Sequence, residues 1–347
     1  MKKIGIITIY DENNYGNRLQ NYAVQEVLKS MNFDVQTIKN INLENKENYF
    51  KQVEELLPAR RKKFLKFIEE NMNNTDEIIL HSEISKNFHE KYDYFVIGSD
   101  QIWNYNFKDR FSDVVFANFA PKEKRISFSA SFGISEVPNE DYNIYDELKN
   151  IKAISVREKA GAEIVKKITG RNDAVVLIDP TMMISKEKWM SVMKRPEQLN
   201  NKKYILKYFL GKFSNEKQKE IELFAKANDC EIVDVLDKNS FYATGPSEFL
   251  YLIKNAYLVI TDSFHSCVFS ILFNTPFLIY EREQIKTNNM YSRIDTLLNT
   301  FKLNDRKFKG KIEKTQLEVD YSHIENILSK EQYKVTEFLN KALKIEM

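Results

Sequence analysis

The sequence predicts an α/β protein with two Rossmann-like domains that face a central cleft. Short β-branched and apolar runs alternate with helical runs along the chain, which is typical of parallel sheets covered by helices. The alternation is interrupted at Asp179-Pro180-Thr181 and then starts again. A chain of 347 residues is also longer than a single core usually supports. We therefore predict a domain boundary and a hinge near residue 180.

The first domain, residues 1–180, is predicted to open with a buried strand over residues 3–9 and a turn-rich loop over residues 11–17. A helix follows, because apolar side chains recur with helical spacing at Leu19, Tyr22, Ala23, Val27 and Leu28. Further strands are predicted at residues 34–38, 94–97, 126–130, 153–156 and 175–178. We interpret the charged helical region at about residues 42–90 as an insertion.

The second domain, residues 181–320, repeats this pattern. The sequence predicts, in order, a helix near residues 186–193, a strand at 204–209, a helix at 215–228, and strands at 231–235 and 258–260. A helix from Ser266 then leads to a strand at residues 277–280. Residues 321–347 are predicted to form a terminal helical segment, which we expect to pack back across the first domain.

Charge and cysteine content argue against several classes of protein. Lys and Arg number 52 and Asp and Glu 50, a net charge of +2, so no overall field favours nucleic acid. Cys230 and Cys267 lack the spacing of a metal site or a disulfide framework, and we predict that both are reduced. The sequence shows neither a signal-peptide pattern nor a run approaching the ~20 apolar residues of a membrane span. We expect a cytoplasmic protein without a metal site.

The segment of residues 258–276 holds the strongest signal for chemistry. A β-branched strand ends in Thr261, Asp262 and Ser263, which are N-cap candidates for the apolar helix that follows. The first turn of such a helix exposes unpaired N–H groups, which suit a phosphate or a carboxylate. His265 in that turn adds a group that can move protons near neutral pH. The alternative is an ordinary cap beside a histidine that bonds to the backbone.

A second polar segment follows the predicted strand at residues 94–97. Gly98 allows a tight turn or the close approach of a ligand, and Ser99 follows it directly. Asp100 and Gln101 offer an acceptor and an amide, and Trp103 offers a flat face for a sugar ring. The alternative is a plain turn beside a core tryptophan.

Three further residues are candidates for binding an anion. Asn17 lies in the loop after the first strand, where it could donate to an anion or a hydroxyl. Arg157 ends the strand at residues 153–156, and its guanidinium group could form two parallel bonds to a carboxylate or a phosphate. Arg293 is a second candidate clamp. Because the carboxyl ends of parallel strands share an edge, we expect the polar segments to gather with His265 in the cleft. Surface pairs or turns remain the alternative for each.

Other motifs bear on cofactor and membrane binding. The spacing of a dinucleotide fingerprint and the phosphate-loop lysine motif are both missing from the sequence, which weakens a nucleotide-cofactor interpretation. The basic run from Arg60 to Lys66 contains interleaved apolar residues. A solvated helix face is the simplest interpretation of this run. Docking on the inner face of an anionic membrane is the alternative.

In order and spacing, these motifs resemble the polysaccharide pyruvyl transferase family from about residue 3 to about residue 300. The resemblance rests on Tyr15-Gly16-Asn17-Arg18, Val96 to Trp103, Ile154 to Glu158, Asp179-Pro180-Thr181 and Thr261 to His265. It implies a fold similar to the GT-B glycosyltransferases. It also implies transfer of an enolpyruvate-derived group from phosphoenolpyruvate to a sugar of a cell-surface polysaccharide or its lipid-linked precursor. The products would be a pyruvate ketal and phosphate, with no cofactor.

The resemblance and the chemistry of this reaction suggest roles for several residues. We expect the first domain to hold the acceptor and the second to hold the donor. His265 would handle a proton at the donor or bind its phosphate, Arg157 would clamp an anionic group, and Asp100 or Asp262 would be the base for the sugar hydroxyl. Ser263 stands where many relatives have an arginine, two residues before the histidine, which shifts anion binding toward Arg157, the helix N-terminus and Arg293.

Two alternatives of other classes stay open. One is a GT-B-type glycosyltransferase in which the same helix N-terminus holds the diphosphate of a nucleotide sugar. The other is a glycan-binding relative without catalytic activity, for which the replacement of the motif arginine by Ser263 is the supporting feature.

Overall fold

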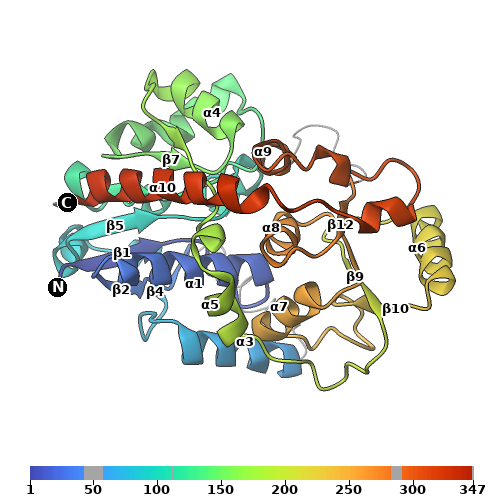
Figure 1. Cartoon of the computed structure of the whole chain (residues 1–347). Coiled ribbons are helices and arrows are strands. Elements are labelled where there is room, and N and C mark those ends of the chain that lie inside the picture. The colour runs from blue at the N-terminus through green and yellow to red at the C-terminus, as the bar shows by residue number, and fades with distance from the viewer. Residues whose placement is uncertain (43–57, 111, 283–290, 346–347) are drawn as a thin grey trace.

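Two four-stranded parallel sheets form the frame of the molecule (Figure 1). They are seen in a computed structural model that describes residues 1–42, 58–110, 112–282 and 291–345. The first sheet has the strand order β2-β1-β5-β6 and the second β10-β9-β11-β12, and every strand pair in both is parallel. This arrangement confirms the predicted α/β fold with two Rossmann-like parts.

The first sheet consists of short strands that the sequence placed to within a few residues: β1 (Lys3–Ile7), β2 (Asp34–Thr37), β5 (Tyr94–Ile97) and β6 (Arg125–Ser127). β1 and β5 are almost wholly apolar because helices and loops cover both faces of the sheet. Beyond β6, the short pair β7 (Ser155–Val156) and β8 (Val175–Val176) continues the edge through bridges between Ile126 and Ala153 and between Ala130 and Val156.

In the described part of this half of the chain, the sheet is accompanied by α1 (Tyr15–Ser30), α3 (Pro58–Asn71) and α4 (Lys159–Thr169). Asn14 caps α1 by accepting a hydrogen bond from the Asn17 backbone N–H at 3.1 Å. Within the predicted insertion, residues 43–57 lie outside the described residues. The rest contains α3 and a short parallel pair, β3 (Asn40–Ile41) with β4 (Ile79–Leu80).

The second sheet contains β9 (Tyr204–Tyr208), β10 (Glu231–Asp234), β11 (Leu258–Thr261) and β12 (Phe277–Ile279). Its helices are α6 (Asn215–Ala227), α7 (Pro246–Lys254), α8 (Phe264–Phe273) and α9 (Ser292–Thr300), and α5 (Lys186–Ser191) lies in the connection between the sheets. The last helix, α10 (Ile324–Leu343), runs back along the first half of the chain (Figure 1). There the Lys152 ammonium group donates to the Ala342 carbonyl at 2.5 Å.

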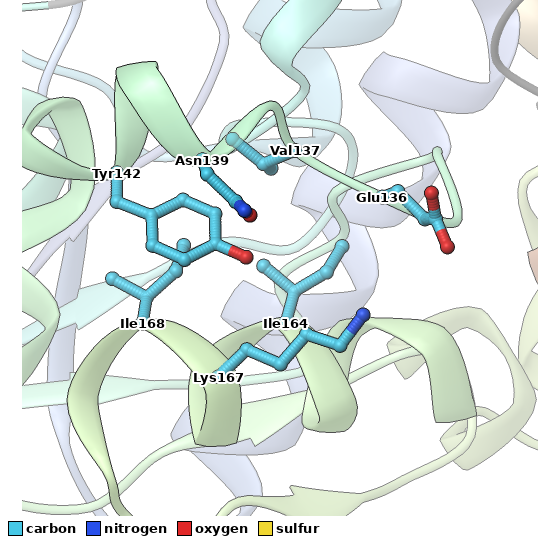
Figure 2. Close-up of a pocket in the computed structure, with 7 residues that line it drawn as sticks. All are labelled: Glu136, Val137, Asn139, Tyr142, Ile164, Lys167 and Ile168. Carbon is cyan, nitrogen blue, oxygen red and sulfur yellow. The ribbon is translucent and has the colours of Figure 1, made fainter.

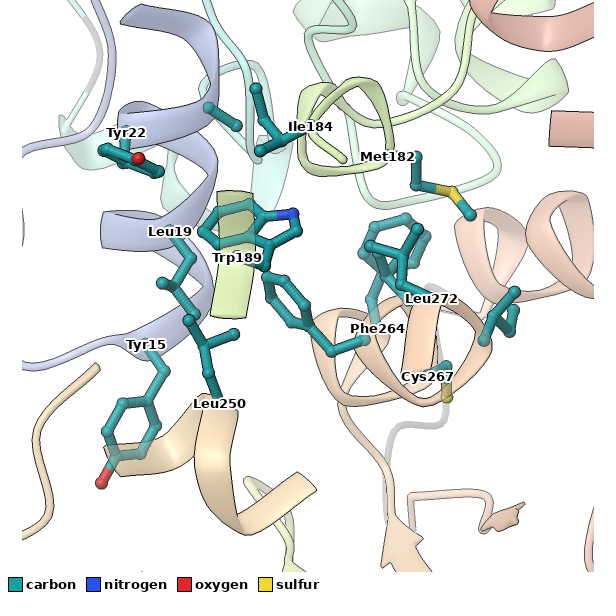
Figure 3. Packing of buried hydrophobic residues seen from close by; sticks show 14 of the residues in the cluster. Tyr15, Leu19, Tyr22, Met182, Ile184, Trp189, Leu250, Phe264, Cys267 and Leu272 are labelled. Carbon is teal, nitrogen blue, oxygen red and sulfur yellow. The ribbon is translucent and has the colours of Figure 1, made fainter. Parts of the chain in front are cut away.

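One continuous apolar core joins the two halves of the chain. Tyr15 of α1 stacks on Phe249 of α7, with ring centroids 4.2 Å apart. Trp189 of α5 packs against Tyr22 of α1 at 5.3 Å (Figure 3). It also packs against Phe269 of α8 at 5.0 Å. We call these five aromatic residues the apolar seam. Because α1 contacts its own sheet on one side and this seam on the other, it is buried over most of its length.

A buried arginine reinforces the seam and corrects one prediction. Arg60 of α3 is 2% exposed and donates to the Tyr15 hydroxyl at 2.6 Å and to the Tyr242 carbonyl at 2.8 Å. Lys63 pairs with Glu248 of α7 at 2.5 Å. Arg60 therefore does not belong to a solvated helix face, because it ties α3 to the second half of the chain. Lys62 and Lys66 of the same run are exposed, and their contact with a membrane stays a prediction. In the described parts of the chain, no helix has the length and apolar content needed to cross a membrane.

Candidate active site

Six titratable side chains gather where the carboxyl edge of the first sheet meets helices α8 and α9. We call them the charge cluster: Asp100, Arg157, Glu158, Asp179, His265 and Arg293. Each is at most 8% exposed. Burying several charges together is costly unless they pair with one another or serve a function. The expected convergence of the polar segments is thus present at this junction.

Arg157 lies at the centre of the charge cluster. Its Nη2 atom donates to the Ser99 hydroxyl at 2.7 Å and lies 2.8 Å from the Asp179 carboxylate. Its Nη1 atom is 3.8 Å from Asp100, too far for a hydrogen bond. Nε and Nη1 have no hydrogen-bond partner among the described residues. The guanidinium group is therefore anchored at one nitrogen and retains donors for a ligand.

Asp179 connects Arg157 to His265. One oxygen accepts from the backbone N–H of Thr181 at 3.0 Å and from its hydroxyl at 2.6 Å. The other pairs with Arg157 and lies 3.6 Å from His265 Nε2. Burial alone would raise the pKa of the Asp179 carboxyl, but Arg157 and His265 together hold that pKa below its usual range. Asp179 is therefore an ionised partner that orients both groups.

His265 projects from the first turn of α8 toward α1. At 3.6 Å from Asp179, its Nε2 atom makes no hydrogen bond to a described residue. Gly16 of α1 lies directly against the imidazole, since a Cβ atom at that position would be 2.0 Å from Nδ1. The imidazole therefore occupies space that only a glycine at position 16 leaves open.

Phe264 supports both arginines of the charge cluster. The guanidinium carbon of Arg157 lies 4.9 Å from the centroid of its ring, and that of Arg293 lies 5.5 Å from the same centroid. With the amide oxygen of Gln101 turned toward it, Arg293 donates from Nη1 and Nη2 at 3.1 and 3.2 Å. Burial and then the like charge of Arg157 lower the pKa of Arg293 to about 10. Two cationic groups thus lie on one aromatic residue.

The loop after β5 is held in place by α1. Asp100 accepts from the Asn17 side-chain amide at 3.0 Å, and the Ser99 backbone N–H donates to Gln20 at 3.0 Å. Gly98 has a φ of +114°, and a Cβ atom there would lie 2.7 Å from the carbonyl oxygen of Phe128. Burial would raise the pKa of Asp100, but Arg157, His265 and Asn17 lower it overall. Asp100 is therefore ionised beside the candidate anion site.

The structure gives Asp262 a different role from the expected one and Ser263 the predicted place at the helix start. Both oxygens of Asp262 are in use, because they accept from the backbone N–H groups of Leu210 and Gly211, each at 2.8 Å, and from Arg282. Ser263 is the N-cap residue of α8 but forms no side-chain cap hydrogen bond. Asp262 thus holds a neighbouring loop, which leaves Asp100 as the candidate base.

The prediction that Trp103 stacks on a sugar is wrong. Its side chain is fully buried and packs against Phe116 and Phe132, with ring centroids 6.0 and 5.5 Å away. The indole N–H donates to the Val115 carbonyl at 3.2 Å. Trp103 is therefore a core residue, which was the alternative interpretation of its position in the sequence.

Unpartnered polar atoms are concentrated at this junction. Buried atoms without a hydrogen-bond partner among the described residues include Nε and Nη1 of Arg157, Oε2 of Glu158, Nε2 of His265, Oγ of Ser266 and Nε of Arg293. Buried polar atoms are normally satisfied, so a cluster of exceptions indicates a place for a polar ligand. By contrast, no group of three or more His, Cys, Asp or Glu side chains within the described ranges is arranged to hold a metal ion.

A small pocket of about 60 Å³ lies elsewhere, beside α4 (Figure 2). It is lined by Glu136, Val137, Asn139, Tyr142, Ile164, Lys167 and Ile168. No predicted site residue lines this pocket.

Comparison with known proteins identifies the family and the fold. A family model for polysaccharide pyruvyl transferases matches residues 14–283. A comparison with curated protein sequences gave no match. Among solved structures, a UDP-GlcNAc 2-epimerase from Neisseria meningitidis bound to UDP-GlcNAc is similar, with 9% identity, a TM-score of 0.52 and full coverage of both chains. A UDP-GlcNAc 2-epimerase from Methanocaldococcus jannaschii has 15% identity and a TM-score of 0.52, covering 94% of this chain and 99% of that one. At these identities, the likeness concerns the GT-B-like fold alone.

Proposed function

This chain belongs to the polysaccharide pyruvyl transferase family, and on that premise we propose that it transfers an enolpyruvate-derived group from phosphoenolpyruvate to a sugar. The acceptor would be a sugar of a cell-surface polysaccharide or of its lipid-linked precursor. The products would be a pyruvate ketal and phosphate.

The observation that carries this proposal is the pair of buried guanidinium groups on the ring of Phe264. Phosphoenolpyruvate has a phosphate and a carboxylate, so it needs two separate anion contacts. Arg157 and Arg293 retain unpartnered donors, and both lie beside the N-terminus of α8, where backbone N–H groups favour negative charge. This arrangement fits a small ligand with two anionic groups.

The reaction needs one proton to be added and two to be removed. Protonation of the methylene carbon of phosphoenolpyruvate gives an oxocarbenium-like centre, which a sugar hydroxyl attacks while losing its proton. Phosphate then leaves, and a second hydroxyl closes the ketal and loses its proton. His265 is our candidate for the proton at the donor and Asp100 for the base at the sugar, each a role commonly worth ~10²–10⁴-fold in rate. Asp179 would orient the imidazole.

Titration calorimetry with phosphoenolpyruvate tests the donor assignment directly. We expect saturable binding to the wild-type protein and ~10–100-fold weaker binding to Arg157→Gln, because a hydrogen bond to a charged group is worth ~1.5–3 kcal/mol. Exposed Arg195→Gln serves as the matched control and should bind like the wild type. Binding of UDP-GlcNAc in place of phosphoenolpyruvate would assign the protein to nucleotide-sugar chemistry instead.

Phosphate release tests the transfer step. Hexopyranosides with free 4- and 6-hydroxyls would be supplied with phosphoenolpyruvate, and His265→Gln should lower the rate by at least ~10²-fold. A folded His265→Gln protein that releases phosphate at the wild-type rate would remove His265 from the proton-transfer role.

A further inference from the structure

Glu158 is a buried carboxyl group of the charge cluster to which the proposed reaction assigns no role. It is 0% exposed and lies at the N-cap position of α4, next to Arg157. Its Oε1 atom accepts from the backbone N–H groups of Phe132 and Gly133 at 2.8 and 3.0 Å. Its Oε2 atom has no hydrogen-bond partner among the described residues. One oxygen of this carboxyl group is therefore fixed, while the other is available to carry a proton.

The charge balance of the junction favours protonation of one carboxyl group when an anionic ligand binds. Two guanidinium groups, of Arg157 and Arg293, face the three carboxyl groups of Asp100, Glu158 and Asp179. With all three carboxyl groups ionised, these five side chains are already net negative before a ligand binds. A ligand with two anionic groups would add at least two more negative charges to a buried site. Like charges that are buried together shift toward protonation.

The other two carboxyl groups are poorly suited to take up a proton. Asp179 accepts two hydrogen bonds from Thr181 and pairs with Arg157 at 2.8 Å. Asp100 accepts from the Asn17 amide and is attracted by Arg157, His265 and Arg293. Protonating either one would weaken hydrogen bonds or a close ion pair that are already formed, whereas Oε2 of Glu158 takes part in no hydrogen bond to a described residue and has only the more distant attraction of the two arginines to lose.

We propose that binding of a doubly anionic ligand at this junction is coupled to the uptake of a proton by Glu158. The inference rests on the proposed function for the identity of the ligand, phosphoenolpyruvate, and on the geometry alone for the uptake. The proton comes from solvent and forms an O–H bond at Oε2, while Oε1 keeps its two backbone donors. When the ligand or its products leave, the proton returns to solvent.

The groups that face Glu158 are consistent with this assignment. Arg157 follows β7, Arg293 lies on α9, and Ser131 and Gly133 lie in the loop after β6. Burial raises the pKa of Glu158, and the two arginines and the hydrogen bond from Gly133 only partly offset this effect. Because an anionic ligand would neutralise the arginines, it would raise the pKa of Glu158 further.

The test is calorimetry at a single pH in two buffers that differ in ionisation enthalpy, such as HEPES and Tris. The difference in apparent enthalpy gives the number of protons taken up when phosphoenolpyruvate or inorganic phosphate binds. We expect the wild type to take up close to one proton more than Glu158→Gln. The proton uptake also makes the affinity for the ligand depend on pH. Above the pKa that Glu158 has in the free protein, the affinity of the wild type should fall by up to about tenfold per pH unit, and this dependence should be absent in Glu158→Gln.

Controls separate this effect from others. Glu163→Gln, an exposed position on the same helix, should match the wild type. His265→Gln should keep the Glu158-dependent uptake, because Glu158 keeps both of its backbone donors in that variant. Equal uptake by the wild type and Glu158→Gln would overturn the inference while leaving the donor assignment intact. Conversely, Glu158-dependent uptake with phosphate but no binding of phosphoenolpyruvate would overturn the donor assignment and keep the inference.

A measurement on the unmodified protein covers the case in which Glu158→Gln does not fold. An infrared difference spectrum on addition of inorganic phosphate should show a new band from a protonated carboxyl group in the wild type. A spectrum without such a band at saturating phosphate would contradict the proposal.

Discussion

The apolar seam and the charge cluster lie on the same interface between the two halves of the chain, but they differ in how fully their side chains are packed and hydrogen-bonded. In the seam, aromatic rings pack at centroid distances of 4.2–5.3 Å, and the Tyr15 hydroxyl both donates to Thr244 and accepts from Arg60. In the charge cluster, polar atoms of Arg157 and His265 have no hydrogen-bond partner among the described residues. The difference indicates that the seam holds the halves together, while the cluster is completed by a ligand.

Phe249→Ala should have the largest effect that the comparison predicts, and it should act on stability. Removing a fully buried phenylalanine that stacks on Tyr15 costs about 3–5 kcal/mol of the free energy of unfolding. Urea denaturation measures this loss. In the protein that remains folded, phosphoenolpyruvate affinity should be unchanged. A large loss of affinity without a loss of stability would show that the two regions are not separate.

Gly16→Ala should act on the charge cluster instead. Because a Cβ atom there would lie 2.0 Å from His265 Nδ1, the imidazole must move. We expect affinity for phosphoenolpyruvate to fall by about tenfold or more, the effect of losing one hydrogen bond to a charged group. Exposed Ser30→Ala on the same helix is the control. Wild-type affinity in Gly16→Ala would show that the position of His265 does not matter for the donor.

Tyr15→Phe sharpens the contrast, because Tyr15 is the sequence neighbour of Gly16 but belongs to the seam. The variant loses the hydrogen bonds to Thr244 and to the charged Arg60, which should cost about 1.5–3 kcal/mol of stability. Phosphoenolpyruvate binding should stay at the wild-type level. Thermal unfolding and calorimetry on the same samples distinguish this outcome from a loss of binding.

The sequence predicted the fold well because the local signals were strong. β5 lies at the predicted residues, and Thr261 to His265 lead from β11 into α8 as expected. Helix α7 was not predicted, although Pro246 at its start and Glu248, which accepts from the Gly245 backbone N–H, form a recognisable helix-start pattern. Short-range patterns therefore sufficed for most of the frame.

The candidate site was only partly predictable because its geometry depends on contacts that are distant in sequence. Asp179 was noted only as a break in the pattern, and nothing local reveals that it pairs with Arg157. The environment of Trp103 depends on Phe116 and Phe132. Likewise, the burial of Arg60 depends on acceptors at Tyr15 and Tyr242. Local spacing cannot distinguish a buried arginine from an exposed one when its partners lie so far along the chain.

The path of α10 along the first half of the chain has a consequence for synthesis. Ribosomes complete a chain from the N-terminus, and domains generally fold in that order. In this molecule, however, Lys152 bonds to Ala342, and α1 is covered by aromatic residues from α7 and α5. The N-terminal half therefore emerges with an uncovered apolar surface that segments much later in the chain cover, so its folding is expected to wait until those segments have been made.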